Sequence, residues 1–155
     1  MSDMKNLLTP DNIIADLPVH CGRETLSCLA RRAAEITGLE ARDILDTLME
    51  RERLGSTGIG RGIAIPHGKL AGLEQMVGIL ARSVEPVDFD AVDGKKVDLF
   101  FLLLAPAQAN ALHLKSLSRI ARTLRNEDVC EALRGANSSE AMYAIVTADE
   151  QIAAA

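Results

Sequence analysis

Hydrophobic and polar positions change period several times along the chain, and each change predicts a different element. From position 24 to 36, apolar residues recur three or four positions apart, and Gly38 follows as a helix C-terminus. A second helix is predicted over 41–53, where the apolar residues share one face and the end is rich in arginine. Helical spacing returns later and predicts three further helices, over 109–125, 127–134 and 138–147.

Between the two groups of helices, apolar and β-branched residues lose the helical spacing and predict strands. A first strand is predicted at 12–17, ahead of the helices, and others at 62–65, 76–82 and 97–105. The last is continuously apolar, as expected for a central strand covered on both faces. This order predicts an α+β fold of three layers (α/β/α), a mixed β-sheet with helices on both faces. We expect one domain over 1–155, with an ordered core of about 8–149.

Composition narrows the class of protein without identifying it. The 155 residues carry a formal net charge of -5, which argues against a general nucleic-acid surface. Cys21, Cys28 and Cys130 are odd in number and lack CxxC spacing, so we interpret them as free buried thiols in a reducing compartment. No signal peptide is evident, and no apolar run is long enough to span a membrane. We therefore expect a cytoplasmic protein that neither inserts into a membrane nor binds nucleic acid.

One segment interrupts the hydrophobic pattern: "GSTGIGRGIAIPHGKL", residues 55–70, in which five of the sixteen residues are glycine. A Walker-type phosphate loop needs GxxxxGK followed by Ser or Thr. Here five residues separate Gly62 from Gly68, and Leu70 replaces the hydroxyl. The dinucleotide fingerprint GxGxxG fails as well, because its third glycine is missing and the segment leads from a helix into a strand, the reverse of the required order.

With both nucleotide motifs excluded, His67 is the candidate reactive residue of this segment. The preceding glycines allow close approach of a partner, Pro66 restricts the backbone, and "IAI" predicts a short buried strand that ends beside the histidine. An imidazole presented there is largely neutral at pH 7 and can act as a nucleophile, a base or a metal ligand. A surface turn without function, or a histidine satisfied by a backbone carbonyl, fits these residues about equally well.

The stretch "GSTGIGRGIAIPHGK" resembles the active-site signature of type-2 enzyme IIA domains of the bacterial phosphoenolpyruvate-dependent phosphotransferase system (PTS), which include the mannitol and fructose IIA domains. The resemblance extends from "LLTPDNIIADL" to "ANSSEAMYAIV" and is greatest toward the nitrogen-regulatory branch of that family. It implies that His67 accepts a phosphoryl group from the phosphohistidine of a small HPr-type carrier protein. It also implies that Nε2 is the attacking atom, while Nδ1–H is held by a neighbouring carbonyl.

The resemblance implies roles for further residues. Arg51 and His113 match the family positions that stabilise the phosphoryl group. Additional donors are expected from the hydroxyls and backbone amides of Ser56, Thr57, Gly58 and Gly68. Arg61 stands where relatives often have a small polar residue, and it is expected to add positive charge beside the site. No metal or other cofactor is required, because the phosphoryl group arrives on the carrier protein.

Several functions remain open at this point. A phosphocarrier with regulatory output would bind or release targets according to its phosphorylation state, and the resemblance implies potassium transporters and sensor kinases as such targets. A IIA component of a fructose- or mannitol-type permease would instead pass the phosphoryl group to a IIB domain. A non-catalytic binding module would not need Arg51, His67 and His113 together. A zinc hydrolase, or a metal site at His20, Cys21 and Cys28, lacks ligands at suitable spacing.

Overall fold

The computed structural model of the protein describes residues 7–154, and within them the elements follow the predicted order. A 3-10 turn, Pro10–Asn12, precedes the first strand. The strands are β1 (Ile13–Leu17), β2 (Gly58–Gly60), β3 (Ile63–Ala64), β4 (His67–Leu70), β5 (Val77–Val87) and β6 (Val97–Pro106). The helices are α2 (Gly22–Thr37), α3 (Ala41–Arg53), α4 (Asn110–Leu124), α5 (Glu127–Gly135) and α6 (Ser139–Ala154).

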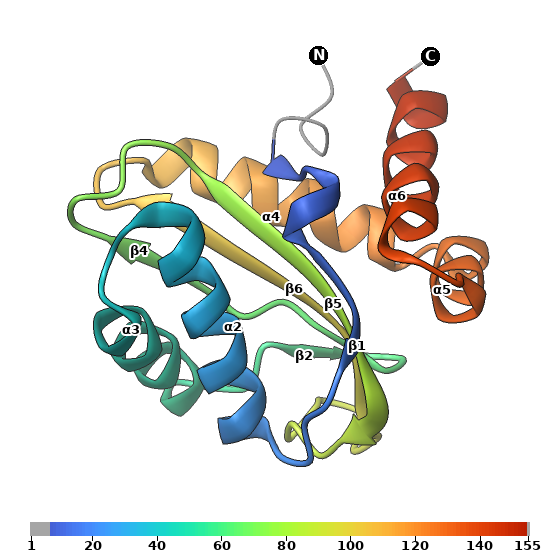
Figure 1. Cartoon of the computed structure of the whole chain (residues 1–155), viewed down its shortest axis with the longest axis horizontal. Coiled ribbons are helices and arrows are strands. Elements are labelled where there is room, and N and C mark those ends of the chain that lie inside the picture. The colour runs from blue at the N-terminus through green and yellow to red at the C-terminus, as the bar shows by residue number, and fades with distance from the viewer. Residues whose placement is uncertain (1–6, 155) are drawn as a thin grey trace.

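The strands form one mixed sheet, which confirms the predicted fold class. Strand β6 occupies its centre, antiparallel to β5 on one side and parallel to β3 and β4 on the other. Strand β1 lies parallel to β5 at one edge, and β2 lies antiparallel to β3 at the other. Helices α2 and α3 cover one face, while α4, α5 and α6 cover the opposite face (Figure 1).

The continuously apolar strand is divided between two hydrophobic cores. Phe100, Leu102 and Leu104 of β6 pack with α2 and α3, whereas Leu99, Phe101 and Leu103 pack with the other three helices. All six side chains are fully buried. The alternation follows from the two-residue period of a strand, which sends successive side chains to opposite faces. The apolar run therefore marks the centre of the three-layer structure, as predicted.

Two parts of the strand prediction need correction. Strand β5 continues to Val87, five residues past its predicted end at 82, because polar residues there interrupt the apolar pattern without ending the strand. Its register with β6 shifts between Arg82 and Val87, where Pro86 offers no backbone N–H. The glycine-rich segment is the second correction, since it forms short strands β2, β3 and β4 rather than one strand after a loop.

The turn between β2 and β3 explains part of the glycine content. Its two central residues, Arg61 and Gly62, have φ values of 59° and 81°. A two-residue hairpin of type I′ requires positive φ at both positions, a conformation that glycine adopts freely and arginine adopts at a cost. The glycines here form an ordered hairpin.

The cysteines were predicted to be buried, and this is correct for Cys130 alone. Cys21 is exposed because it caps α2, where its Sγ accepts a hydrogen bond from the amide of Glu24 at 3.4 Å. Cys28 is half-buried, and all three are free thiols. In the described part of the chain, no helix combines the length and apolar character needed to cross a membrane.

Candidate functional site

His67 is the first residue of β4 and lies beside the central strand. It is paired in register with Leu103 of β6, whose amide donates to the carbonyl of Pro66 at 3.0 Å. The sequence placed His67 at the end of the strand "IAI", whereas the structure places it at the start of the next one. The backbone of the histidine is thus fixed by the sheet, and its side chain is only partly buried.

Hydrogen bonds define the tautomer of the His67 ring. Nδ1 lies 2.8 Å from the carbonyl oxygen of Ile65. Because a carbonyl oxygen can only accept, Nδ1 carries the hydrogen and donates it. The other nitrogen, Nε2, then keeps its lone pair and accepts from Nε of Arg51 at 3.3 Å. The arrangement fixes the ring plane and leaves Nε2 as the basic, nucleophilic atom.

Gly68 allows α3 to pack directly on β4, next to His67. A Cβ atom at this position would lie 2.6 Å from Cγ2 of Thr47, which is too close for any residue other than glycine without movement. Thr47 and Arg51 lie four positions apart on α3 and so share a helix face. Close packing at Gly68 therefore brings the guanidinium of Arg51 to the imidazole. Thr47 was missed from the sequence, although its spacing from Arg51 on the predicted helix was a usable signal.

A second contact holds the Arg51 side chain in place. Nη1 donates to the carbonyl oxygen of Gly55 at 2.8 Å, at the start of the glycine-rich segment. The guanidinium thus bridges the end of α3 and the ring of His67. A permanently charged, planar group with further N–H donors is well suited to phosphate oxygens.

His113 comes from the other face of the sheet, in the first turn of α4. Its ring centroid lies 5.5 Å from that of His67, with the ring planes inclined at 51°. The residue is 5% exposed, and its Nδ1 is buried without a hydrogen-bond partner among the described residues. A hydrogen bond from Lys69 Nζ to Asn110 Oδ1 ties β4 to the start of this helix. The ring of His113 therefore lies beside that of His67 and carries a buried polar atom that no described residue satisfies.

Both imidazoles are held toward the neutral form. Burial lowers the pKa of His67 below its ordinary value, and the positive charge of Arg51 acts in the same direction. The hydrogen bond to Ile65 and the charge of Glu52 oppose this effect without reversing it. The pKa of His113 is also lowered, first by burial and then by His67 and Lys69. Near neutral pH, the site therefore combines two uncharged rings with a fixed cation.

The supporting residues named from the sequence are structural in this state. The hydroxyl of Ser56 donates to the carbonyl of Phe89 at 2.6 Å, and that of Thr57 donates to the carboxylate of Glu52. Glu52 also accepts from the Thr57 amide at 3.0 Å, a role that sequence reasoning missed. A Cβ at Gly58 would lie 2.9 Å from the backbone of Ala91, so this glycine serves close packing. The hydroxyl hydrogens of Ser56 and Thr57 are therefore not directed at His67.

Arg61 does not add charge beside His67, contrary to expectation. Its Nη1 pairs with Glu127 of α5 at 3.2 Å. Ile63 and His67 pair with residues four positions apart on β6, and four residues of a strand span roughly 13 Å. The extended backbone between the turn and His67 thus carries Arg61 to the far end of the sheet.

The metal alternative has no geometry to support it. His20 pairs with Glu85 at 3.5 Å, and Cys28 accepts from Arg31 at 3.2 Å. Cys21 is engaged in its helix cap. Over the residues described, no three His, Cys, Asp or Glu side chains are arranged to hold an ion.

Most of the chain matches the model of a known protein family. Residues 6–149 match the family model described as "Phosphoenolpyruvate-dependent sugar phosphotransferase system, EIIA 2". The chain belongs to this family, the type-2 enzyme IIA components of the PTS.

Individual relatives and solved structures are similar to almost the whole chain. It is 46% identical over 141 residues to the nitrogen regulatory protein of Bradyrhizobium diazoefficiens, covering 91% of this chain and 92% of that one. The crystal structure of nitrogen regulatory protein IIA-Ntr from Neisseria meningitidis superposes with a TM-score of 0.87 at 38% identity, covering 92% and 97% of the two chains. A fructose-specific EIIA component of Haloferax volcanii is 34% identical over 147 residues, which is 94% of this chain and 96% of that protein.

Proposed function

We propose that the protein is a phosphohistidine carrier, with His67 as the phosphoryl acceptor. The observation that carries this proposal is the ring of His67, whose Nδ1–H is fixed to Ile65 while Nε2 holds a lone pair beside Arg51. A lowered pKa supports the same role, because a neutral ring is the nucleophilic form. Membership in the PTS EIIA 2 family makes a phosphohistidine of an HPr-type carrier the natural donor.

In the proposed reaction, the lone pair of Nε2 attacks the phosphorus of the donor phosphohistidine in line with the bond that breaks. The new N–P bond forms as the donor N–P bond cleaves, and the bonding pair returns to the donor imidazole. The Nδ1 proton stays on His67 and continues to donate to Ile65. No metal is needed for this exchange, since the reaction asks mainly for positioning and for stabilisation of charge on the phosphoryl oxygens.

Arg51 and His113 supply that stabilisation. The N–H of Arg51 that now points at Nε2 must leave it before attack, and it then donates to a phosphoryl oxygen. His113 donates a ring N–H to another oxygen, a role that the position of its ring beside that of His67 supports. Exposed apolar side chains also favour a protein partner, because Leu54, Leu112 and Leu114 are exposed close in sequence to Arg51 and His113.

The output of phosphorylation is proposed to be regulatory. A phosphoryl group on His67 adds a charge of about -1.5 to -2, enough to favour or forbid an interface. The similarity to nitrogen regulatory proteins supports this output. The class of target that we propose is transporters and sensor kinases, potassium transport included. The competing proposal is a sugar-permease IIA component that transfers the phosphoryl group to a IIB domain, favoured by the similarity to a fructose-specific component.

The acceptor assignment is tested by incubating the protein with phosphoenolpyruvate, enzyme I and an HPr-type carrier. We expect acid-labile, alkali-stable phosphate on the wild type and none on His67→Ala. His20→Ala is the matched control, because this exposed histidine lies outside the site and should leave labelling unchanged. Label that persists in His67→Ala would overturn the proposal. Chase of the labelled protein with purified IIB domains separates the two outputs, since only a permease component should lose its label to IIB rapidly.

A further inference from the structure

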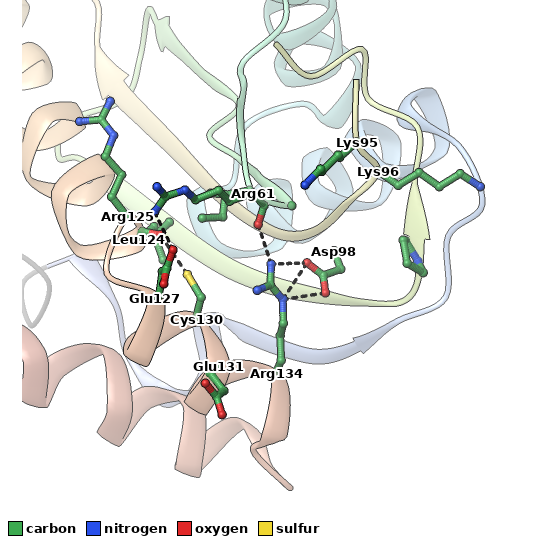
Figure 2. Close-up of a pocket in the computed structure, with 13 residues that line it drawn as sticks. Arg61, Lys95, Lys96, Asp98, Leu124, Arg125, Glu127, Cys130, Glu131 and Arg134 are labelled. Atoms are coloured by element: carbon green, nitrogen blue, oxygen red, sulfur yellow. Dashed lines mark hydrogen bonds and ion pairs between the residues drawn. The ribbon is translucent and has the colours of Figure 1, made fainter. Parts of the chain in front are cut away.

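A concave site lies at the far end of the sheet from His67. It is a cavity of about 710 Å³ between the β2–β3 turn, the start of β6 and the junction of α4 with α5 (Figure 2). This volume lies within the range of pockets that hold small molecules. The phosphoryl-transfer reaction proposed above uses none of the residues that line it.

The lining of this cavity is basic, although the chain as a whole is acidic. Its cations are Arg61, Lys95, Lys96, Arg125 and Arg134. Two of its three carboxylates are already neutralised, Glu127 by Arg61 at 3.2 Å and Asp98 by Arg134 at 2.9 Å. Glu131 is the third. Within residues 7–154, the side chains of Lys95, Lys96 and Arg125 make no ion pair or hydrogen bond. The cavity therefore holds uncompensated positive charge in a protein of net charge -5.

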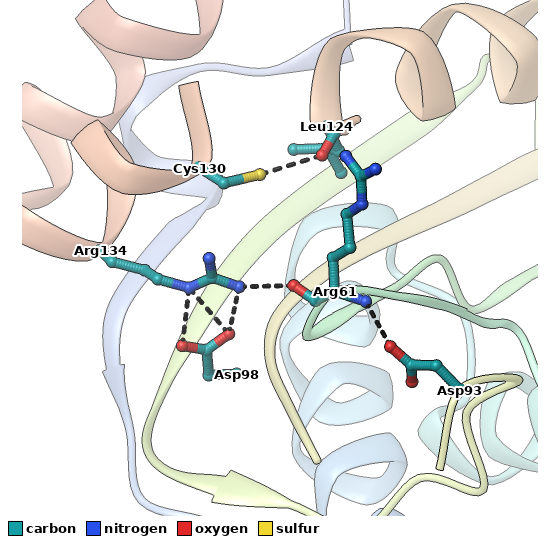
Figure 3. A network of polar contacts seen from close by, with 6 residues as sticks. All are labelled: Arg61, Asp93, Asp98, Leu124, Cys130 and Arg134. Atoms are coloured by element: carbon teal, nitrogen blue, oxygen red, sulfur yellow. Dashed lines mark hydrogen bonds and ion pairs between the residues drawn. The ribbon is translucent and has the colours of Figure 1, made fainter. Parts of the chain in front are cut away.

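Arg134 is held rigidly with one nitrogen unused. Nε bonds to both carboxylate oxygens of Asp98 at 3.1 and 2.9 Å, and Nη2 donates to Asp98 and to the carbonyl of Arg61, each at 2.9 Å. Figure 3 shows the third nitrogen of this guanidinium pointing away from Asp98. In the described part of the chain, Nη1 makes no hydrogen bond. An arginine fixed in this way binds an anion with little further loss of side-chain entropy.

The β2–β3 turn, which holds Arg61 at positive φ, is hydrogen-bonded to Arg134 of the same cavity. Arg61 has a φ of 59°, and its amide donates to Asp93 at 2.9 Å while its carbonyl accepts from Arg134. Backbone strain of this kind persists only where surrounding contacts hold it. These contacts fix the backbone of Arg61 at the cavity, and its side chain extends to the junction of α4 with α5, where it pairs with Glu127 (Figure 2).

Apolar side chains complete the cavity and indicate the kind of ligand. Pro86 gives the cavity an exposed apolar wall, whereas Ile63 and Leu124 lie beneath its floor and are almost fully buried. With five cations and three carboxylates, the lining keeps an excess of two positive charges, which favours a ligand with more than one negative charge, and the volume leaves room for a body beyond the anionic groups. We propose that this cavity binds a small metabolite that carries two or more phosphate groups on a less polar body, a molecule of nucleoside diphosphate size.

Isothermal titration of the full-length protein with four probes tests this proposal. ADP carries both the phosphate groups and the less polar body of the proposed ligand. Pyrophosphate carries only the phosphate groups, and adenosine only the body. Citrate carries a comparable negative charge on carboxylates. We expect saturable binding of ADP, binding of pyrophosphate about tenfold weaker because the body contacts are lost, and no binding of adenosine. Citrate binding tighter than that of ADP would overturn the assignment to phosphates, and adenosine binding as tight as that of ADP would overturn the role of the cations.

Variants locate the binding and separate it from phosphoryl transfer. Arg125→Glu should weaken ADP binding by about tenfold, because it removes a charge-assisted contact and adds repulsion. Arg42→Glu is the matched control: it makes the same charge change at an exposed position of α3, on the other face of the sheet, and should have no effect. Lys96→Glu is a second pocket variant if Arg125→Glu folds poorly. Absence of saturable anion binding, equal weakening by Arg125→Glu and Arg42→Glu, or loss of binding in His67→Ala would each overturn the proposal.

Discussion

His67 and the basic cavity lie near opposite ends of the same central strand, and both are suited to phosphate in different ways. At His67, one cation is fixed beside two neutral rings, and the attacking nitrogen keeps its lone pair. At the cavity, three cations make no ion pair or hydrogen bond within the described residues. The candidate nucleophile of its lining is the Cys130 thiol, and burial raises the pKa of this thiol, which favours the unreactive protonated form. The first arrangement favours brief covalent attachment of phosphate, and the second favours reversible binding of a stable anion.

The difference shows that positive charge alone does not locate a phosphoryl-transfer site. More cations surround the cavity than the His67 site. Transfer of a phosphoryl group also needs a nucleophile with a free lone pair, and cations alone do not supply one. A single arginine on a packed helix gives charge stabilisation and can still move off Nε2. Four predictions test this contrast between the two regions.

Removing Arg51 should have the largest effect. In Arg51→Ala, phosphoryl transfer to His67 should slow by about 10²-fold, the usual cost of losing one donor to a developing negative charge. Rapid-quench measurement of acid-labile label gives the rate. Arg125→Ala is the matched control at the other end of the strand and should transfer at the wild-type rate. If the two arginine variants slow transfer equally, the contrast between the regions fails.

Replacing His113 should have a smaller effect on the same rate. His113→Gln keeps a hydrogen-bond donor of similar size but alters its position, and we expect transfer to slow by about tenfold. The free energy of unfolding, measured by urea titration, should change little, because the buried ring nitrogen makes no hydrogen bond within the described residues. An unchanged transfer rate in a folded variant would remove His113 from the site.

The fold could be predicted to a large extent from the sequence because its hydrophobic periods are regular. The predicted helix over 41–53 coincides with α3, and the continuous apolar run became the central strand. The extension of β5 could not be predicted, since polar positions in it are exposed and Pro86 suggests an end. The β2–β3 hairpin could not be predicted for a different reason. Its turn places Arg61 at positive φ, a backbone conformation that arginine disfavours.

The site was less accessible to sequence reasoning than the fold. The glycine-rich context and the failure of two nucleotide motifs made His67 a candidate and no more, and Arg51 and His113 entered only through the family resemblance. Arg51 lies beside His67 because α3 packs on Gly68, and His113 lies beside it because α4 packs against the opposite face of the sheet. Neither contact can be recognised from the residues around these positions in the sequence. The position of the Arg61 side chain was predicted wrongly. The sequence did not show that the backbone between Arg61 and His67 is extended and so separates the two residues.

The packing of α3 on β4 gives a prediction about stability. Gly68→Ala should lower the free energy of unfolding by about 1–3 kcal/mol, because its Cβ would overlap Cγ2 of Thr47. Thr47→Ser removes that methyl group and keeps the hydroxyl bond to Asp43, so the double variant should recover most of the loss. Gly135→Ala is the control, since a Cβ there meets nothing within 4 Å. Urea titration decides, and failure of Thr47→Ser to rescue Gly68→Ala would contradict this account of the packing.

The smallest expected effect is on the pH dependence of stability. Because the folded protein lowers the pKa of His67 and His113, the unfolded chain binds more protons once the pH falls below the ordinary histidine value of about 6.5. The free energy of unfolding should therefore decline as pH falls from neutral through the folded pKa values. In a variant carrying His67→Gln and His113→Gln this decline should be shallower, whereas His20→Gln, which alters an exposed ion pair with Glu85, should retain it. Equal slopes in the double variant and the wild type, from urea titrations across this range, would show that the rings are not held neutral by folding. The neutral nucleophile that distinguishes the His67 site from the basic cavity would then lose its physical basis.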